Sequence, residues 1–174
     1  MINKIKLKQG FTLIELILYI ALVSIFISGA ILFSWDIIYG RVKSDVGQEV
    51  NQNLRLAAKR ISYEIRNASV INSVSASDLC LASSTAARNP TRIYVSSGRL
   101  HIAWGGGTAN CTSMTSDLPL TSNLVTVSGL TFTDRSSGTN SYNIEYSFTV
   151  SSTATRKEWQ KSQSYSSSAE MRSN

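Results

Sequence analysis

The stretch Lys8-Gln-Gly-Phe-Thr-Leu-Ile-Glu-Leu16, with the apolar run that follows it to Trp35, decides how this chain is organised. Three lysines, at positions 4, 6 and 8, precede the run, and Glu15 is its single charged residue. A helix of about 25 residues spans about 38 Å, which is enough to cross a bilayer. Because flanking lysines stay in the cytoplasm, the sequence predicts one membrane pass with the remaining chain on the far side.

Glu15 is unusual in a helix that faces lipid. An ionised carboxylate at the bilayer centre costs about 2.5–3.5 kcal/mol on insertion scales, although Glu15 lies near the interface, where the cost is lower. The sequence offers no cation near it on the membrane side. Cleavage of the peptide bond after Gly10 would give Phe11 a free α-ammonium group. Glu15 would then pair with the amine of its own chain or, after lateral packing, with that of a neighbour.

The segment Gly10-Phe-Thr-Leu-Ile-Glu-Leu16, preceded by basic residues, resembles the prepilin processing site of type IV pilins and type II secretion pseudopilins. This resemblance implies that a prepilin peptidase cuts after Gly10 and that Phe11, the new N-terminus, is N-methylated. It also implies that Glu15 promotes assembly into a filament. The chain departs from many members of the family in having no helix-kinking proline within the span.

Three other interpretations of the apolar run compete with this one. A secretory signal peptide would be cut at Ser28-Gly29-Ala30, but the apolar run continues to Trp35, and an acid in such a segment is unusual. A plain signal anchor with a chance Glu15 is the second alternative. A soluble core helix is disfavoured because the run exceeds about 18 residues.

The helix is predicted to continue beyond Trp35 as an amphipathic helix. Apolar residues recur at intervals of three and four, and no proline interrupts them. These residues are Ile38, Val42, Val46, Val50, Leu54, Ala57, Ile61, Ile65 and Ala68. One unbroken helix from about Phe11 to about Asn67 would be about 85 Å long. The second half of its apolar stripe must be buried against the rest of the chain.

The residues after 68 are rich in Ser and Thr and predict a β-domain with polar turns. Residues 69–90 are expected to form a loop. Arg92–Ser96 and Arg99–Trp104 alternate like two strands joined by a tight turn. Tyr142–Val150 alternates as well, with its apolar residues on one face. A final strand is expected at about residues 156–165.

The predicted fold class is α+β: a long N-terminal helix packed on a C-terminal antiparallel β-sheet head domain, as in pilins. The expected segments are a leader (1–10), a transmembrane helix (11–35), its amphipathic continuation (36–68), a β-rich head domain (69–165) and a weakly ordered polar tail (166–174). Arg60–Ala68 and the order of the later strands resemble, more loosely, W-type minor pilins and J-type minor pseudopilins. This second resemblance favours a minor subunit over a major one.

The charge of the chain does not by itself indicate a nucleic-acid partner. The 174 residues carry a formal net charge of +6, and removal of residues 1–10 leaves 14 basic against 11 acidic side chains, or +3. Arg55, Lys59, Arg60 and Arg66 lie on the predicted helix, where we expect a solvated face. No direct nucleic-acid contact is therefore predicted.

Cys80 and Cys111 are the two cysteines of the sequence and fall in loop-like segments on the predicted oxidising side. A disulfide between them is expected, with two buried or free thiols as the alternative. His101 is the sole histidine and lies on a predicted strand, which favours a structural role over a metal site. Four residues are candidate calcium ligands, but their spacing matches no recognised loop, so they are interpreted as turn and surface residues: Asp117, Asp134, Asn140 and Glu145.

No nucleophile–base set, phosphate loop or Walker-type lysine stands out, so no enzyme activity, cofactor or metal is predicted. The favoured function is a structural subunit of a type IV pilus or type II secretion-like filament. The alternative is a signal-anchored extracytoplasmic binding module. Expected partners are other pilin or pseudopilin subunits, the prepilin peptidase, an inner-membrane assembly platform and membrane lipid. The expected location is the cytoplasmic membrane and then the filament at the cell surface.

Overall fold

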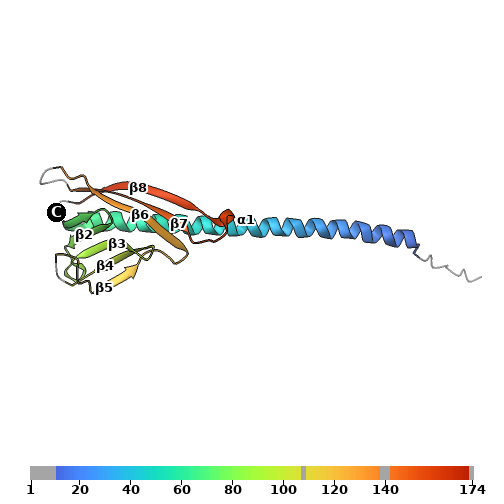
Figure 1. Ribbon diagram of the computed structural model, residues 1–174, viewed down its shortest axis with the longest axis horizontal. Coiled ribbons are helices and arrows are strands. Elements are labelled where there is room, and N and C mark those ends of the chain that lie inside the picture. Colours follow the sequence, from blue (N-terminus) through green and yellow to red (C-terminus); the bar gives the residue numbers. More distant parts are fainter. Residues whose placement is uncertain (1–10, 107–108, 138–141, 173–174) are drawn as a thin grey trace, which may run out of the picture. The chain divides into compact units, whose positions relative to one another are not determined.

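The computed structural model describes residues 11–106, 109–137 and 142–172, so the predicted leader, Gly10 and Asn140 lie outside the described residues. Helix α1 (Leu13–Asn67) is followed by β-strands and by two short 3-10 helices, η1 (Ala86–Arg88) and η2 (Lys157–Trp159) (Figure 1). By its internal contacts the chain divides into two compact units, Met1–Val42 and Lys43–Asn174. α1 begins in the first unit and ends in the second.

The part of α1 in the first unit exposes apolar side chains on every side. Leu13, Phe26 and Trp35 are 76%, 77% and 53% exposed, respectively. The best window of 18 residues in α1 has a mean hydropathy of 2.7, and none of it is buried. Among the described residues, α1 is thus a helix long and apolar enough to cross a membrane, by length and composition.

The serines of this apolar stretch satisfy their own hydrogen-bonding groups. The hydroxyl groups of Ser24, Ser28 and Ser34 each donate to the backbone carbonyl oxygen four residues earlier, at 2.7–2.8 Å. Hydroxyl groups without a partner are costly in an apolar environment, and these local bonds remove that cost. These three hydroxyl groups can therefore lie in lipid or among other helices without being left unpaired.

In the second unit, the predicted apolar stripe of α1 is buried from Val50 onward. Val50, Ala57, Ile61 and Ile65 are fully buried, and Leu54 is nearly so. These residues share one hydrophobic core with the strands of both sheets. The amphipathic continuation is therefore confirmed over this part of the helix.

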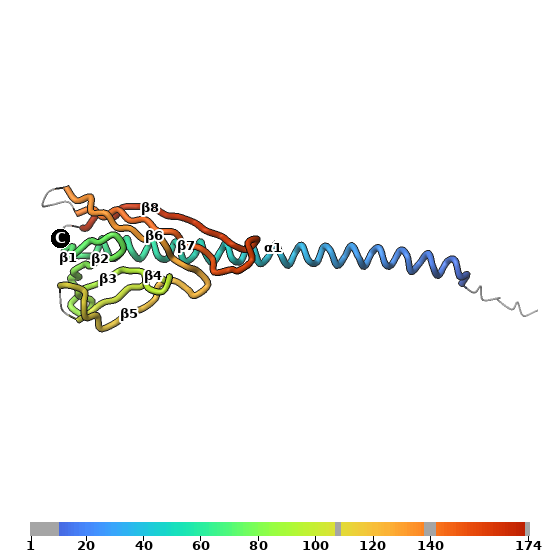
Figure 2. Tube along the Cα trace, viewed as in Figure 1, coloured from blue at the N-terminus to red at the C-terminus, as the bar shows by residue number. Residues whose placement is uncertain are grey.

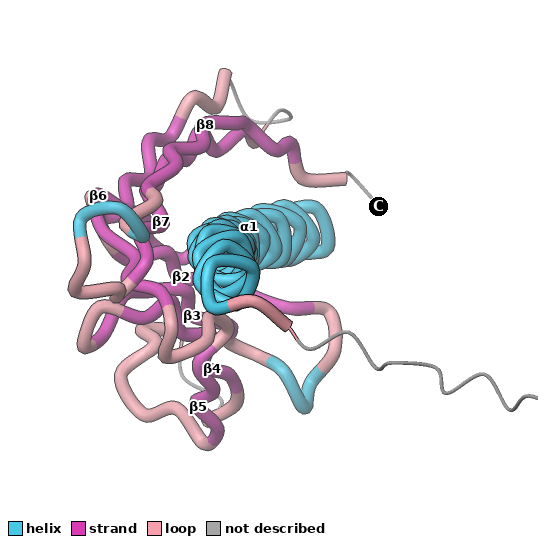
Figure 3. Tube along the Cα trace, turned by 90° about the vertical axis from the view of Figure 1, so that its right-hand side faces the viewer, coloured by secondary structure: helices cyan, strands magenta, loops and turns pink. Residues whose placement is uncertain are grey.

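Two antiparallel sheets surround this part of the helix. The first has the order β1-β2-β3-β4-β5 and the second β6-β7-β8. The strands of the first are β1 (Ala68–Ser75), β2 (Asp78–Ser83), β3 (Thr91–Ser96), β4 (Arg99–Trp104) and β5 (Ser116–Pro119). Those of the second are β6 (Val125–Asp134), β7 (Asn143–Ser152) and β8 (Ser162–Glu170). Together they curve round the second half of α1 and leave one side of it uncovered (Figure 2, Figure 3).

The strands with regular alternation agree with the sequence. β3 and β4 form the predicted hairpin, in which Ser96 pairs with Arg99. The turn residues Ser97 and Gly98 both have positive φ, at 50° and 71°, as a two-residue hairpin turn requires. β7 buries its apolar face as expected. The predicted α+β architecture, a long helix packed on antiparallel sheets, is confirmed.

Two predictions about the head domain are wrong. Residues 69–90 are not a loop, because β1 and β2 form a hairpin there. Register shifts after Ala68 and Ile71 break the alternation of β1, so its sequence has no clear period. The last strand is β8, not residues 156–165, and it extends into the predicted tail as far as Glu170. Because β8 is rich in serine, its hydropathy pattern does not identify it as a strand, but its backbone pairs with β7 along the whole strand.

Candidate functional site

The start of α1 is the first candidate site. The carbonyl oxygen of Thr12 accepts a hydrogen bond from the backbone N–H of Leu16 at 3.1 Å. Its hydroxyl oxygen accepts one from the backbone N–H of Glu15 at 3.4 Å, in the manner of an N-cap. Glu15 thus lies in the first turn of the helix. A carboxylate in a first turn is stabilised by the positive end of the helix dipole.

Phe11 precedes the helix by two residues, and its side chain is 78% exposed. Phe11, the predicted new N-terminus, therefore lies four residues before Glu15, which is in the first turn of α1. The sequence had placed Phe11 and Glu15 about one turn apart, and the helix start agrees with that spacing. Gly10, the third residue of the predicted processing site, lies outside the described residues.

The disulfide joins the other pair of predicted site residues. Cys80 and Cys111 are bonded, with their Cα atoms 6.0 Å apart, and enclose a loop with a sequence separation of 31. Cys80 lies in β2, not in a loop as the sequence suggested. Both cysteines are buried. The bond closes the segment that contains the β3–β4 hairpin.

A network of polar side chains covers one face of the first sheet. The carboxylate of Asp117 accepts hydrogen bonds from the hydroxyl of Tyr94 and from Nδ1 of His101, the latter at 2.9 Å. Partial burial opposes ionisation of Asp117, but these two hydrogen bonds hold its pKa below the ordinary value. Burial, and then the hydrogen bond to Asp117, raise the pKa of Tyr94. His101 is therefore one member of a network that links β3, β4 and β5.

The candidate calcium ligands do not converge. Asp117 belongs to the first sheet, whereas Asp134 and Glu145 lie on the second. Asp134 accepts a hydrogen bond from the backbone N–H of Ser136 at 2.8 Å, and Glu145 forms a salt bridge with Arg135 at 2.9 Å. Among the residues that the structure describes, no group of three or more His, Cys, Asp or Glu side chains is placed to hold a metal ion.

A buried ion pair was missed in the sequence. Glu64 is 8% exposed and lies 2.6 Å from the guanidinium of Arg60, with that of Arg88 at 3.7 Å. Arg88 also stacks over the ring of Trp104. Arg60 therefore does not belong to the solvated face that its sequence context suggested. The spacing of four residues between Arg60 and Glu64 was the available signal.

Comparison with protein families gives one result. Residues 5–31 match the family described as the prokaryotic N-terminal methylation motif. The match includes Phe11 and Glu15 and supports the type IV pilin and pseudopilin family, without assigning the particular type of subunit. Searches among curated proteins and among solved structures each found no match.

The motif also supports general conclusions about how the chain is processed and what class of protein it is. It implies processing by a prepilin peptidase and assembly with other pilin subunits, and it indicates a structural subunit rather than an enzyme. Together with the apolar first half of α1, it also indicates that the chain is anchored in a membrane.

Proposed function

We propose that this chain is a minor pilin or pseudopilin, cut after Gly10, N-methylated on Phe11 and assembled into a type IV pilus or a type II secretion-like filament through α1. The match of residues 5–31 to the methylation motif carries the proposal. The looser resemblance of Arg60–Ala68 to minor subunits supports the minor type.

Cleavage would place a positive charge at the start of α1. The new α-ammonium group lies at the positive end of the helix dipole, where a cation is unfavourable. Glu15, in the first turn, compensates that charge within its own chain or in a neighbouring subunit. In a bilayer or a helix bundle, where water does not screen the charges, this pairing favours one axial register between neighbouring helices.

The exposed side chains of the first unit support assembly through the helix. They are apolar all round, and the serines among them bond to their own backbone. Lipid covers such a surface before assembly, and helices of other subunits can replace the lipid afterwards. An assembly platform in the inner membrane would act at the step in which helices of other subunits replace the lipid.

The head domain supports an extracytoplasmic location. A disulfide is typical of oxidising compartments, and the lysines before the apolar run would keep the N-terminus in the cytoplasm. The subunit would therefore begin in the cytoplasmic membrane with its head outside, and later become part of the filament at the cell surface.

Intact-mass measurement of the protein extracted from cell membranes tests the proposal. We expect a chain that lacks residues 1–10 and carries one additional methyl group on Phe11. The same measurement on a Gly10→Val variant should show the uncut chain, because the peptidase of this family accepts a small residue at that position. A native protein that keeps its leader, or that begins at Ile31, would instead identify a signal-anchored or secreted binding module.

A further inference from the structure

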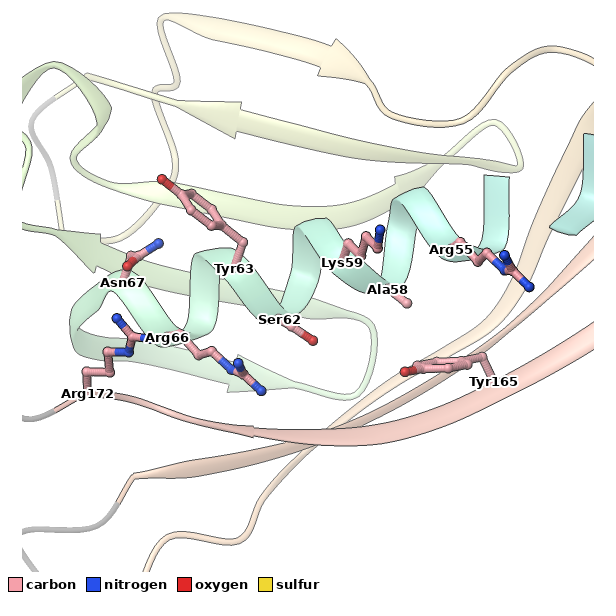
Figure 4. A pocket seen from close by; sticks show the side chains of 9 residues that line it. All are labelled: Arg55, Ala58, Lys59, Ser62, Tyr63, Arg66, Asn67, Tyr165 and Arg172. Carbon is pink, nitrogen blue, oxygen red and sulfur yellow. The ribbon is translucent and has the colours of Figure 1, made fainter. Parts of the chain in front are cut away.

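An open groove of about 530 Å³ lies between α1 and β8 on the side of the helix that the sheets leave uncovered (Figure 4). Four of its lining residues are cations: Arg55, Lys59, Arg66 and Arg172. Tyr63 and Tyr165 also line it. Figure 4 shows Arg55 and Arg172 toward its two ends, with Ser62, Arg66 and Tyr165 between them.

The cations of the groove are not neutralised by the protein. None of the four forms a salt bridge with a carboxylate in the described part of the chain, whereas Arg60, Arg88, Arg92 and Arg135 each do. Lys43–Asn174 contains 13 Lys and Arg against 9 Asp and Glu. Other cations of this unit also form no salt bridge in the described part of the chain, among them Lys43, Arg156, Lys157 and Lys161. What distinguishes the groove is that four such cations line one surface.

Tertiary structure builds this row from two distant segments. Arg55, Lys59 and Arg66 lie on one face of α1 and extend over about 17 Å at 1.5 Å per residue. The backbone N–H of Arg172 donates to the carbonyl oxygen of Arg66 at 3.3 Å, which fixes Arg172 beside the helix. The fourth cation therefore comes from more than 100 residues away in the sequence.

The two tyrosines give the groove flat apolar surfaces. Tyr165 is packed against the rings of Tyr146 and Phe148, with centroid distances of 6.2 and 5.9 Å, so its ring is held in the wall of the groove. Tyr63 is 55% exposed on the helix itself, where the guanidinium of Arg60 lies over its ring at 5.4 Å from the centroid. An acidic polypeptide would use the cations but has no need of these rings. A single strand of nucleic acid uses both, because its phosphates bind cations and its bases stack on aromatic rings.

We infer that this groove binds single-stranded nucleic acid, with phosphates on the four cations and bases against Tyr63 and Tyr165. Binding is a property of the head domain and needs neither cleavage after Gly10 nor filament assembly. It can therefore be tested on the purified full-length chain in a non-ionic detergent, and its failure would leave the proposed function untouched.

The first experiment measures fluorescence anisotropy of a labelled oligothymidylate of about 20 nucleotides at several salt concentrations. Each phosphate contact contributes about 0.7 to the slope of log K against log salt for single strands, so the groove should contribute about 2.8. A variant that replaces all four groove cations with Gln should lose about that much slope. The leader lysines are present in every variant and cancel in this comparison.

A matched variant controls for the loss of charge as such. It replaces four exposed cations elsewhere in the second unit with Gln: Lys43, Arg156, Lys157 and Lys161. We expect its slope to change by less than about one. An equal loss of slope in both variants would overturn the inference, because binding would then follow net charge and not the groove. Thermal melting of each variant verifies that the head remains folded.

The second experiment tests the aromatic contact without removing charge. Tyr63→Ala should weaken oligothymidylate binding by about 5- to 100-fold, whereas Tyr142→Ala, at another exposed tyrosine, should leave it unchanged. Neither variant should alter the binding of an abasic oligomer of the same length. Unchanged oligothymidylate affinity in Tyr63→Ala would overturn the inference. So would poly-L-glutamate binding as tightly at equal salt, which would identify the groove as a site for acidic polypeptides.

Discussion

The two halves of α1 belong to one helix, but the apolar side chains of the first half are exposed, whereas the apolar stripe of the second half is buried. In the first unit, Leu22, Ile25 and Phe26 are 62–77% exposed. In the second, Val50, Ile61 and Ile65 are fully buried in the core that the helix shares with the two sheets. Burial of such a side chain is worth about 1.5–3 kcal/mol. The second half gains this within its own chain, whereas the first half must obtain it from lipid or from other subunits.

The largest expected effect tests the first half alone. Glu15→Ala should abolish incorporation into filaments, because the terminal ammonium group loses its compensating charge, while insertion into the membrane continues. Quantification of the subunit in membrane and sheared-filament fractions measures both. Asp36→Ala, which removes another exposed acid of the same helix, is the matched control and should still be incorporated. Normal incorporation of the Glu15 variant would remove the charge-pairing argument.

In the second half of α1, truncation of a buried side chain should lower the stability of the head domain. Ile61→Ala removes a fully buried side chain and should lower the free energy of unfolding of the head by about 4 kcal/mol. Leu56→Ala, on the exposed side of the same stretch, should change it by no more than about 0.5 kcal/mol. Denaturant titration of the full chain in detergent measures both. Equal effects at the two positions would contradict the difference in burial between the two faces of this half.

Removal of the disulfide should affect the head and leave the first unit unchanged. The double variant Cys80→Ser/Cys111→Ser opens a loop with a sequence separation of 31, and the loop-entropy model gives a loss of about 3.7 kcal/mol. The native protein treated with a reductant should show the same loss. The membrane-bound fraction should not change in either case. A variant as stable as the oxidised native protein would show that the sheets and α1 hold the head without the bond.

The smallest effect concerns pH. The folded-state pKa of Asp117 is lowered, because the hydrogen bonds from Tyr94 and His101 outweigh the opposing effect of burial. Its contribution to stability is therefore present above the ordinary carboxyl pKa and is lost as the pH falls through the lower, folded-state value. Asp117→Asn should flatten the acid limb of the stability profile below about pH 4. Thermal melting between pH 7 and the acid range measures this, and an unchanged profile would contradict it.

The sequence predicted those parts of the fold that have a local pattern. The apolar stripe from Val50 to Ile65, the hairpin around Ser97 and Gly98, and the alternation of β7 are each visible within a few turns or residues. β1 was missed because its register shifts interrupt the period of two. β8 was expected, but its predicted bounds lay too early in the sequence, because backbone hydrogen bonds can hold a serine-rich strand and leave no mark in the hydropathy pattern.

The candidate site residues also divide into those that a local sequence pattern predicted and those that it did not. The methylation motif is contiguous, so the roles expected of Gly10, Phe11 and Glu15 follow from a short segment, and they remain predictions. The pairing of Cys80 with Cys111 was predicted because the chain has two cysteines, although the strand that holds Cys80 was not. The ion pair of Glu64 with Arg88 joins α1 to a segment beyond β2, and spacing along the helix could not indicate it.

The sequence by itself determined that a long apolar helix begins beside an acid, continues as an amphipathic helix and leads into a polar β-domain, because charge, hydropathy and periodicity are local properties. Only the tertiary structure decided which face of that helix stays uncovered. It also placed Arg172 beside Arg66 and Tyr165 in the wall of the same groove, and so turned a row of surface cations into a groove. Such contacts depend on how strands pair across long stretches of chain, and this pairing is settled by the packing of the whole domain rather than by any one segment.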